Sequence, residues 1–308
     1  MDNSRDGGGA VPEGVRLRDV VALLEEFYPV HTAQSWDRVG LVAGDPEQSV
    51  GTILLAVDPT LDVVAEAVAL GADLIITHHP LLLKGIHSVA TTTAKGATIT
   101  ELLVNDIGLY CAHTNADVAD PGVGQALSMA CGLIDTEPLQ VTEDQELGRV
   151  GDLPEPVSLQ QLATRLVEHL PPTAGGIRVS GPAAAPVRRV AVLGGAGDSA
   201  FEAVRRSGAD VYVTADLRHH PALEAREEAR AAARAGASST PYLVDAGHYA
   251  TEWLWLPGLR DRLAARLGGS VDICLSSVRT DPWDFVVGAG GPESHHSENH
   301  PTDHGGMP

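Results

Sequence analysis

The feature that most constrains the fold is a repeated alternation between short apolar runs and segments with helical spacing. In the first half, the expected strands lie at 51–58, 73–77 and 107–112, and the expected helices between and after them lie at 61–71, 92–106 and 122–132. The alternation restarts near residue 187, with expected strands at 187–195, 209–214, 241–247 and 270–276. Strands separated by helices predict βαβ crossovers. We therefore expect the α/β class, with two α/β domains that each contain a mixed or largely parallel sheet flanked by helices.

Length and local composition indicate where the domains begin and end. A chain of 308 residues exceeds the size at which one core grows comfortably. We expect a first α/β domain over residues 16–135 and a second over 187–287. The interval 136–186 is weakly patterned and is expected to connect the two, with a possible strand at 146–153, a helix at 158–170 and a Pro/Ala/Gly-rich stretch at 171–186. Residues 1–15 and the His-rich residues 288–308 lack periodicity and are expected to be disordered tails.

Charge and cysteine content exclude several classes of partner. The formal net charge is -20, whereas nucleic-acid backbones and anionic membranes need clustered Lys and Arg. Three cysteines without CxxC spacing favour reduced thiols over a disulfide framework or a thiolate zinc site. The N-terminal residues contain no apolar signal region, and no run of 18 apolar residues occurs. We expect a cytoplasmic protein whose partner is neither a nucleic-acid polymer nor a membrane.

Histidines and carboxylates gather at the ends of three expected strands, where sites form in open α/β sheets. His78 and His79 follow the strand at 73–77 in DLIITHHPLLL. His113 and Asp117 follow the strand at 107–112 in HTNAD. His248 and Glu252, in GHYATE, are four residues apart at the start of a helix, so their side chains share one face.

Each group alone also has an ordinary structural interpretation: a histidine pair in a turn, an acidic helix N-cap, or a solvated helix face. Together they form a nitrogen and carboxylate ligand set that suits Zn, Mn, Fe, Co or Ni. Five protein ligands exceed the three plus water of a catalytic zinc site. They fit two ions that share a carboxylate. We therefore expect two divalent transition-metal ions per chain, with one of the adjacent histidines, His78 and His79, on each ion.

Other motifs leave two interpretations open. The loop GGAGDS (194–199) is either a phosphate-binding turn or a plain tight turn. His219 and His220 either line the same cleft or begin a helix. Trp36 and Asp37, in SWDRVG, either form a wall beside the substrate or anchor the fold.

In order and spacing, the motifs SWDRVG, DLIITHHPLLL, HTNAD, DAGHYATE and SSVRTDPW resemble those of the Nif-three-like dinuclear metal centre proteins, which are also described as GTP cyclohydrolase I type 2 homologues. The resemblance covers about residues 17–285. It implies a homohexamer, a trimer of dimers, with metal pairs facing an internal cavity. The metal ligands that it implies are His78, His79, Asp117, His248 and Glu252, with Glu252 as the bridge between the two ions. It implies that His113 is a nearby orienter or substrate contact.

The same resemblance implies a dinuclear metal-dependent hydrolase that acts on a small-molecule substrate, a nucleotide or related heterocycle, through a metal-bound hydroxide. His113 and His220 are the expected proton carriers. Two alternatives remain: a hexameric regulatory or scaffold protein that binds metal without turnover, and a two-metal phosphoesterase. The acidic composition argues against GTP itself, because Lys84 or Arg218 would have to recruit a triphosphate against the field of the protein.

Overall fold

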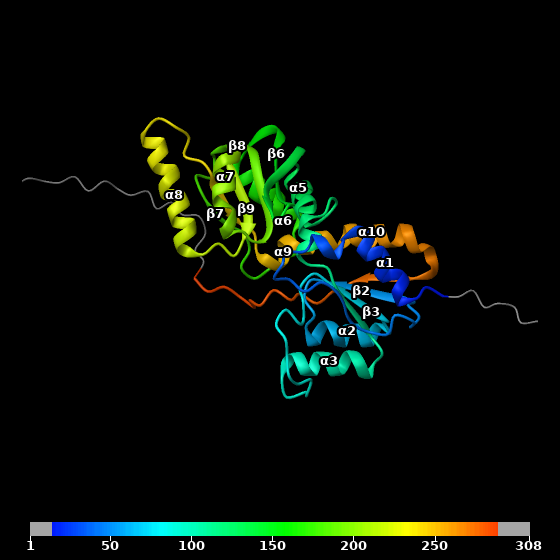
Figure 1. The fold of residues 1–308 in the computed structure, drawn as a ribbon. Coiled ribbons are helices and arrows are strands. Elements are labelled where there is room, and N and C mark those ends of the chain that lie inside the picture. Colours follow the sequence, from blue (N-terminus) through cyan, green and yellow to red (C-terminus); the bar gives the residue numbers. More distant parts are fainter. Residues whose placement is uncertain (1–13, 289–308) are drawn as a thin grey trace, which may run out of the picture.

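A computed structural model describes residues 14–288 and contains two sheets, each flanked by helices (Figure 1). The expected mixed α/β class is thereby confirmed. The expected tails at 1–15 and 288–308, with the tail histidines, lie almost wholly outside the described residues. Within 14–288, no helix has the length and apolar character needed to cross a bilayer.

The first sheet has the strand order β1-β4-β3-β2-β11. Its strands are β1 (Gly40–Ala43), β2 (Thr52–Ala56), β3 (Leu74–Thr77), β4 (Gly108–Cys111) and β11 (Asp272–Leu275). All neighbouring pairs are parallel except β1 with β4. One face packs against α2 (Leu61–Leu70) and α3 (Ala94–Val104), and the other against α1 (Leu17–Phe27) and α10 (Trp255–Leu267) (Figure 1).

The strand β2 illustrates why these sequences form this sheet. Ile53 and Leu55 join the core on the α1 and α10 side, whereas Leu54 joins the core on the α2 and α3 side. This is the two-residue period of a strand, and it is apolar throughout because both faces are covered. The connection to α2 is set by Thr60, whose hydroxyl accepts a hydrogen bond from the Val63 amide. Polar chemistry is therefore confined to the strand ends.

The second sheet has the strand order β5-β6-β8-β9-β10-β7. Its strands are β5 (Ile134–Thr142), β6 (Gln145–Ser158), β7 (Arg178–Ser180), β8 (Pro186–Ala196), β9 (Val211–Ala215) and β10 (Tyr242–Asp245). One core contains α5 (Val123–Cys131) and α6 (Leu159–His169), and the other contains α7 (Phe201–Ser207) and α8 (His219–Arg234). The short elements are α4 (Thr114–Val118), α9 (His248–Trp253), η1 (Val30–Thr32), η2 (Asp198–Ala200) and η3 (Gly268–Ser270).

Two segments belong to a sheet that their place in the sequence does not suggest. The interval 136–186, expected to connect the domains with a few elements of its own, supplies most of β5 and all of β6 and β7 to the second sheet, and α6 packs against that sheet. Conversely, β11 lies within the range expected for the second domain but pairs with β2 of the first sheet. Strands that follow one another in sequence usually lie close in space, and β11 departs from this rule.

The helix expected to begin at His248 is short: α9 ends at Trp253, and a second helix, α10, follows it at Trp255. Pro257 lies in the first turn of α10. Proline is accommodated in a first turn but disrupts a helix interior, because it lacks an amide hydrogen and its ring clashes with the preceding turn. The break therefore separates the short helix that carries His248 and Glu252 from the longer helix that covers the first sheet.

Candidate metal centre

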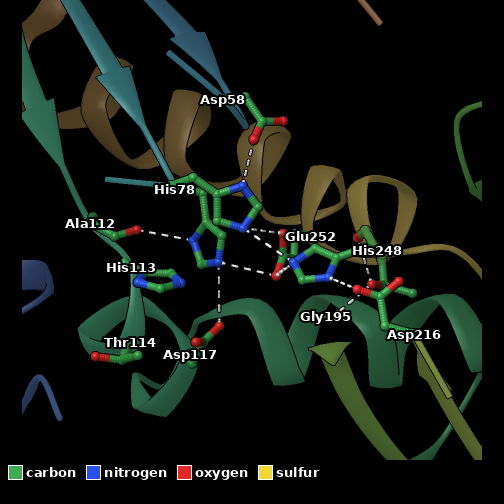
Figure 2. Close-up of polar contacts among 12 residues, drawn as sticks. Asp58, His78, Ala112, His113, Thr114, Asp117, Gly195, Asp216, His248 and Glu252 are labelled. Atoms are coloured by element: carbon green, nitrogen blue, oxygen red, sulfur yellow. Dashed lines mark hydrogen bonds and ion pairs between the residues drawn. The ribbon is translucent and has the colours of Figure 1, made fainter. Parts of the chain in front are cut away.

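The predicted ligands come from both halves of the chain and meet in one cluster (Figure 2). His78 and His79 follow β3, and Asp117 lies in α4, directly beyond β4. His248 and Glu252 lie in α9, directly beyond β10. The strand ends therefore deliver nitrogen and carboxylate side chains from two sheets to a common centre, as the sequence pattern predicted.

Four histidines of the cluster share one arrangement: Nδ1 of each ring is held by a fixed acceptor. The pairs are His78 with the Ala112 carbonyl (3.0 Å), His79 with Asp58 Oδ1 (2.7 Å), His113 with Asp37 Oδ1 (3.0 Å) and His248 with Asp216 Oδ2 (2.8 Å). A carbonyl or ionised carboxylate oxygen only accepts hydrogen bonds, so each Nδ1 carries the proton. Each Nε2 is then left with a lone pair, which is the arrangement found around protein-bound metals.

Two of these lone pairs face each other. Nε2 of His79 and Nε2 of His248 are 3.2 Å apart, and each is 3.0 Å from an oxygen of Glu252. Two facing lone pairs repel unless a proton or another cation lies between them. Burial opposes charge on both rings, yet the Glu252 carboxylate raises the pKa of His79 to about 10 and that of His248 to about 9. A metal ion bound here would displace those protons.

On the other side of Glu252, the distances are too long for hydrogen bonds. His78 Nε2 is 3.5 Å from Glu252 Oε1 and 3.6 Å from Asp117 Oδ1. The His78 ring is fully buried, and its Nε2 has no hydrogen-bond partner among the described residues. Two ligands about 2.1 Å from one tetrahedral ion stand roughly 3.4 Å apart. The two distances from His78 Nε2 are therefore of the size found between two ligands of one ion.

The two carboxylates of the cluster differ in their electrostatic setting. Burial alone would raise the pKa of Glu252, but the neighbouring rings of His78 and His79 hold it well below its ordinary value. Burial raises the pKa of Asp117, and the nearby Glu252 charge adds to this while His78 opposes it. Glu252 is thus an anion with or without metal. Asp117 has a raised pKa, so its ionised form is the one that a cation beside it would stabilise most.

The loop GGAGDS packs against the cluster. Gly195 has φ +65, and a Cβ at this position would lie closer than 3.0 Å to Glu252 Oε1. The Gly195 amide donates a hydrogen bond to the Thr251 hydroxyl at 3.0 Å, so this amide is not available to a phosphate. Residues 194–196 form the end of β8, where its pairing with β9 is irregular, rather than a tight turn, and Gly195 makes room for the Glu252 carboxylate.

His113 lies at the edge of the cluster. Its ring centroid is 5.1 Å from that of His78, and its ligand atom lies within 4.8 Å of those of His78 and His79. Asp37, which is buried, fixes the ring and also accepts hydrogen bonds from the amide and hydroxyl of Thr114. Trp36 stands edge-on to His113 with 49% of its surface exposed. Trp36 is therefore not a buried anchor of the fold, and Asp37 is the buried residue of this motif.

His220 is placed differently from the other predicted site residues. It lies exposed in the first turn of α8, where its ring contacts that of His219. No ion pair or hydrogen bond between His220 and the cluster is present in the described part of the chain. The histidine pair after β9 therefore begins a helix, and this geometry does not support the expected proton-carrying role of His220.

Asp58 and Asp216 are functional candidates that the sequence reasoning missed. They hold the rings of His79 and His248, and they stand just beyond the carboxyl ends of β2 and β9. The available signal was an acidic residue just beyond a strand, at the same sheet edge as the histidines. Such residues orient metal-binding rings from outside the ligand set.

Asp58→Asn is expected to weaken Zn²⁺ binding by about 10- to 100-fold, because an amide no longer fixes the tautomer and angle of the His79 ring. The measurement is competition with a chromophoric chelator, using the full chain. Asp62→Asn, an exposed position in the first turn of α2, is the matched control. Equal affinities for both variants and the parent would contradict a role for Asp58.

A cavity of about 770 Å³ opens onto one side of the cluster. His79 and His248 line it together with Tyr249. The loop 173–178 and the C-terminal segment 280–286 supply much of the remaining wall. A small molecule in this cavity can therefore reach the cluster directly.

The chain is similar to known proteins over nearly all of the described residues. A sequence model of the family described as Duf34/NIF3 (NGG1p interacting factor 3) matches residues 15–282. A Streptomyces coelicolor protein named GTP cyclohydrolase 1 type 2 homolog is 47% identical, over 88% of this chain and 95% of the relative. A Clostridium perfringens protein of the same name is 30% identical, over 88% of this chain and 100% of the relative.

Solved structures show the same architecture. The crystal structure of a Bacillus cereus protein related to NIF3 gives a TM-score of 0.75 at 26% identity, over 88% of this chain and 99% of the other. That of a Staphylococcus aureus protein gives 0.77 at 28% identity, over 89% and 100%. The range matched by the family model, residues 15–282, contains strands of both sheets and all the residues of the cluster.

Proposed function

Because the chain belongs to the Duf34/NIF3 family, as its motifs suggested, we propose that it is a metal-dependent hydrolase acting on a nucleotide or a related heterocycle. Its relatives carry the name GTP cyclohydrolase 1 type 2 homolog, which supports the substrate part of the proposal. The observation that carries the metal part is the pair of facing Nε2 atoms of His79 and His248 beside a buried carboxylate. Such a pair is stable only with a proton or a metal ion between the two nitrogens, and the buried carboxylate favours either.

The donor set fits two ions better than one. His79, His248 and Glu252 form one group, and His78 Nε2 lies 3.5 Å from Glu252 Oε1 and 3.6 Å from Asp117 Oδ1. Glu252 would bridge the two ions, and each of the adjacent histidines would serve a different ion. Two divalent ions held in this way lower the pKa of a water molecule and supply a hydrolytic nucleophile near neutral pH.

His113 is suited to proton transfer. Its ring is held by Asp37 through Nδ1, it stands next to His78, and its side chain retains 15% exposure. A histidine that is oriented but not wholly enclosed can take a proton from an attacking water molecule and deliver it to a leaving nitrogen. Trp36 covers one edge of this ring and limits access of bulk water from that direction.

Incubation of Zn²⁺- or Mn²⁺-loaded full chain with a panel of nucleotides, nucleosides and phosphoesters, read by mass spectrometry, tests the proposal. The expected result is a product that has gained one water molecule, formed by the parent and by Glu66→Gln but not by Glu252→Gln. Glu66 is a matched control because its carboxylate accepts hydrogen bonds from Ser276 and Ser277 outside the cluster. Phosphate release alone would identify a phosphoesterase, and no Glu252-dependent product would favour a regulatory or scaffold role.

A further inference from the structure

The cavity beside the cluster carries more negative than positive charge. The aspartates that line it are Asp58, Asp216, Asp245 and Asp281. Among its lining residues, the one Lys or Arg side chain is that of Arg178. Arg178 is already paired, because its Nη2 donates to Asp245 Oδ2 at 2.6 Å. Arg218, which the sequence suggested as an anion contact, is likewise paired with Asp198. Among the described residues that line this cavity, no unpaired Lys or Arg is available to a polyphosphate.

Bound metal does not reverse this balance. Two divalent ions bring four positive charges, and Glu252 and Asp117 offset two of them. The cavity wall contributes a further net charge of three negatives, from its four aspartates and one arginine. The protein as a whole has a formal net charge of -20. A triphosphate would therefore enter a low-dielectric cleft of its own sign, where like charges repel most strongly.

The same wall offers a flat surface and hydrogen-bond acceptors. Trp283 lines the cavity and leaves 67% of its surface exposed. Gly175 and Gly176 also line it, and nothing lies within 4 Å of a Cβ position on either residue, so the backbone there is open to a ligand. Oδ2 of Asp281 is buried and has no hydrogen-bond partner among residues 14–288. An exposed indole favours a stacked planar ring, and an unpaired carboxylate oxygen favours an N–H donor.

From these contacts we infer that the cavity binds an uncharged or cationic planar nitrogen heterocycle, of the nucleobase or nucleoside class, and disfavours nucleoside polyphosphates. The ring stacks on Trp283, and its N–H groups donate to the wall aspartates. This inference rests on the proposed function, because the ring must reach the cluster at His79 and His248. It narrows the substrate to the heterocycle without its phosphates.

Equilibrium dialysis of the Zn²⁺-loaded full chain against guanosine, GMP, GDP and GTP tests the inference. Metal content is measured on the same samples. The affinity is expected to fall with each added phosphate, by about tenfold or more from guanosine to GTP, and the difference should shrink as salt screens the repulsion. An affinity that rises along the series, or no binding of guanosine to fully loaded protein, would overturn it.

Trp283→Ala is expected to weaken guanosine binding by roughly tenfold or more, since stacking of one base contributes about 1–3 kcal/mol. Phe285→Ala is the matched control, because Phe285 lies two residues away, is 77% exposed and is not part of the cavity wall. Asp281→Asn should narrow the gap between guanosine and GTP. Equal losses at Trp283 and Phe285 would contradict the stacking role.

Failure of the two proposals can be told apart. If the parent takes up no metal, the proposed function fails and this inference fails with it. If the parent is fully loaded but prefers GTP, or ignores the whole series, only the inference about the substrate class fails. Neither outcome depends on turnover, because binding and metal content are both read directly.

Discussion

Glu252→Gln is expected to abolish metal binding by the full chain. Its two carboxylate oxygens stand 3.0 Å from the Nε2 atoms of His79 and His248, and Oε1 also approaches His78. Glutamine keeps the shape but loses the charge that both proposed ions share. The loss of affinity should exceed the roughly 100-fold that is typical for residues outside the ligand set.

Elemental analysis after dialysis against Zn²⁺ is the measurement, and the parent should hold about two ions per chain. Removing the charge also leaves the partly buried His79 and His248 with Asp58 and Asp216 as their remaining carboxylates, and deleting one partner of a buried pair costs at most about 3–5 kcal/mol. The metal-free variant should therefore melt below the metal-free parent. Glu66→Gln should retain its metal. A fully loaded Glu252→Gln protein would refute the shared-ligand role.

Gly195→Ala is expected to lose metal although it removes no ligand. A Cβ at Gly195 would overlap Glu252 Oε1 and would lie 3.3 Å from His248 Nε2. The backbone at φ +65 adds strain of about 1–2 kcal/mol for any residue with a Cβ. The carboxylate must therefore move away from its histidine partners, and zinc content should fall with it.

Gly71→Ala separates the two effects. Gly71 ends α2 at φ +66, which matches Gly195, but nothing lies within 4 Å of its Cβ position. The backbone strain should lower the melting temperature of the metal-free protein by a similar amount in the two variants, while only Gly195→Ala should lose zinc. If both variants keep their metal, or both lose it, the steric explanation is wrong.

Local sequence pattern was sufficient to predict much of the fold. The parallel strands, their connecting helices and the histidines at their ends follow from apolar periodicity, which each segment carries by itself. The hairpin of β5 and β6 did not follow. Pro154 and Pro156 lie within β6, and prolines at this spacing are more typical of a linker than of a strand. In the structure they occupy the irregular stretch between Asp152 and Val157, where prolines are tolerated in a sheet.

The ligands of the candidate site could be predicted from the sequence, but the residues that position those ligands could not. His78, Glu252 and the other expected ligands carry their chemistry in the residue type itself. Gly195 and Asp216 act only through what they touch, and their contacts join segments more than thirty residues apart. No local pattern distinguishes such a glycine from a turn glycine, or such an aspartate from a solvated one.

The position of β11 sets a constraint on how the protein is made. β2 leaves the ribosome early, but its outer neighbour β11 is among the last described residues. At about 5–20 residues per second, the intervening stretch of roughly 200 residues takes on the order of 10–40 seconds to synthesise. During that time the nascent chain presents an unpaired, strongly apolar strand edge. Shielding of that edge by a chaperone is therefore most valuable while translation is still in progress.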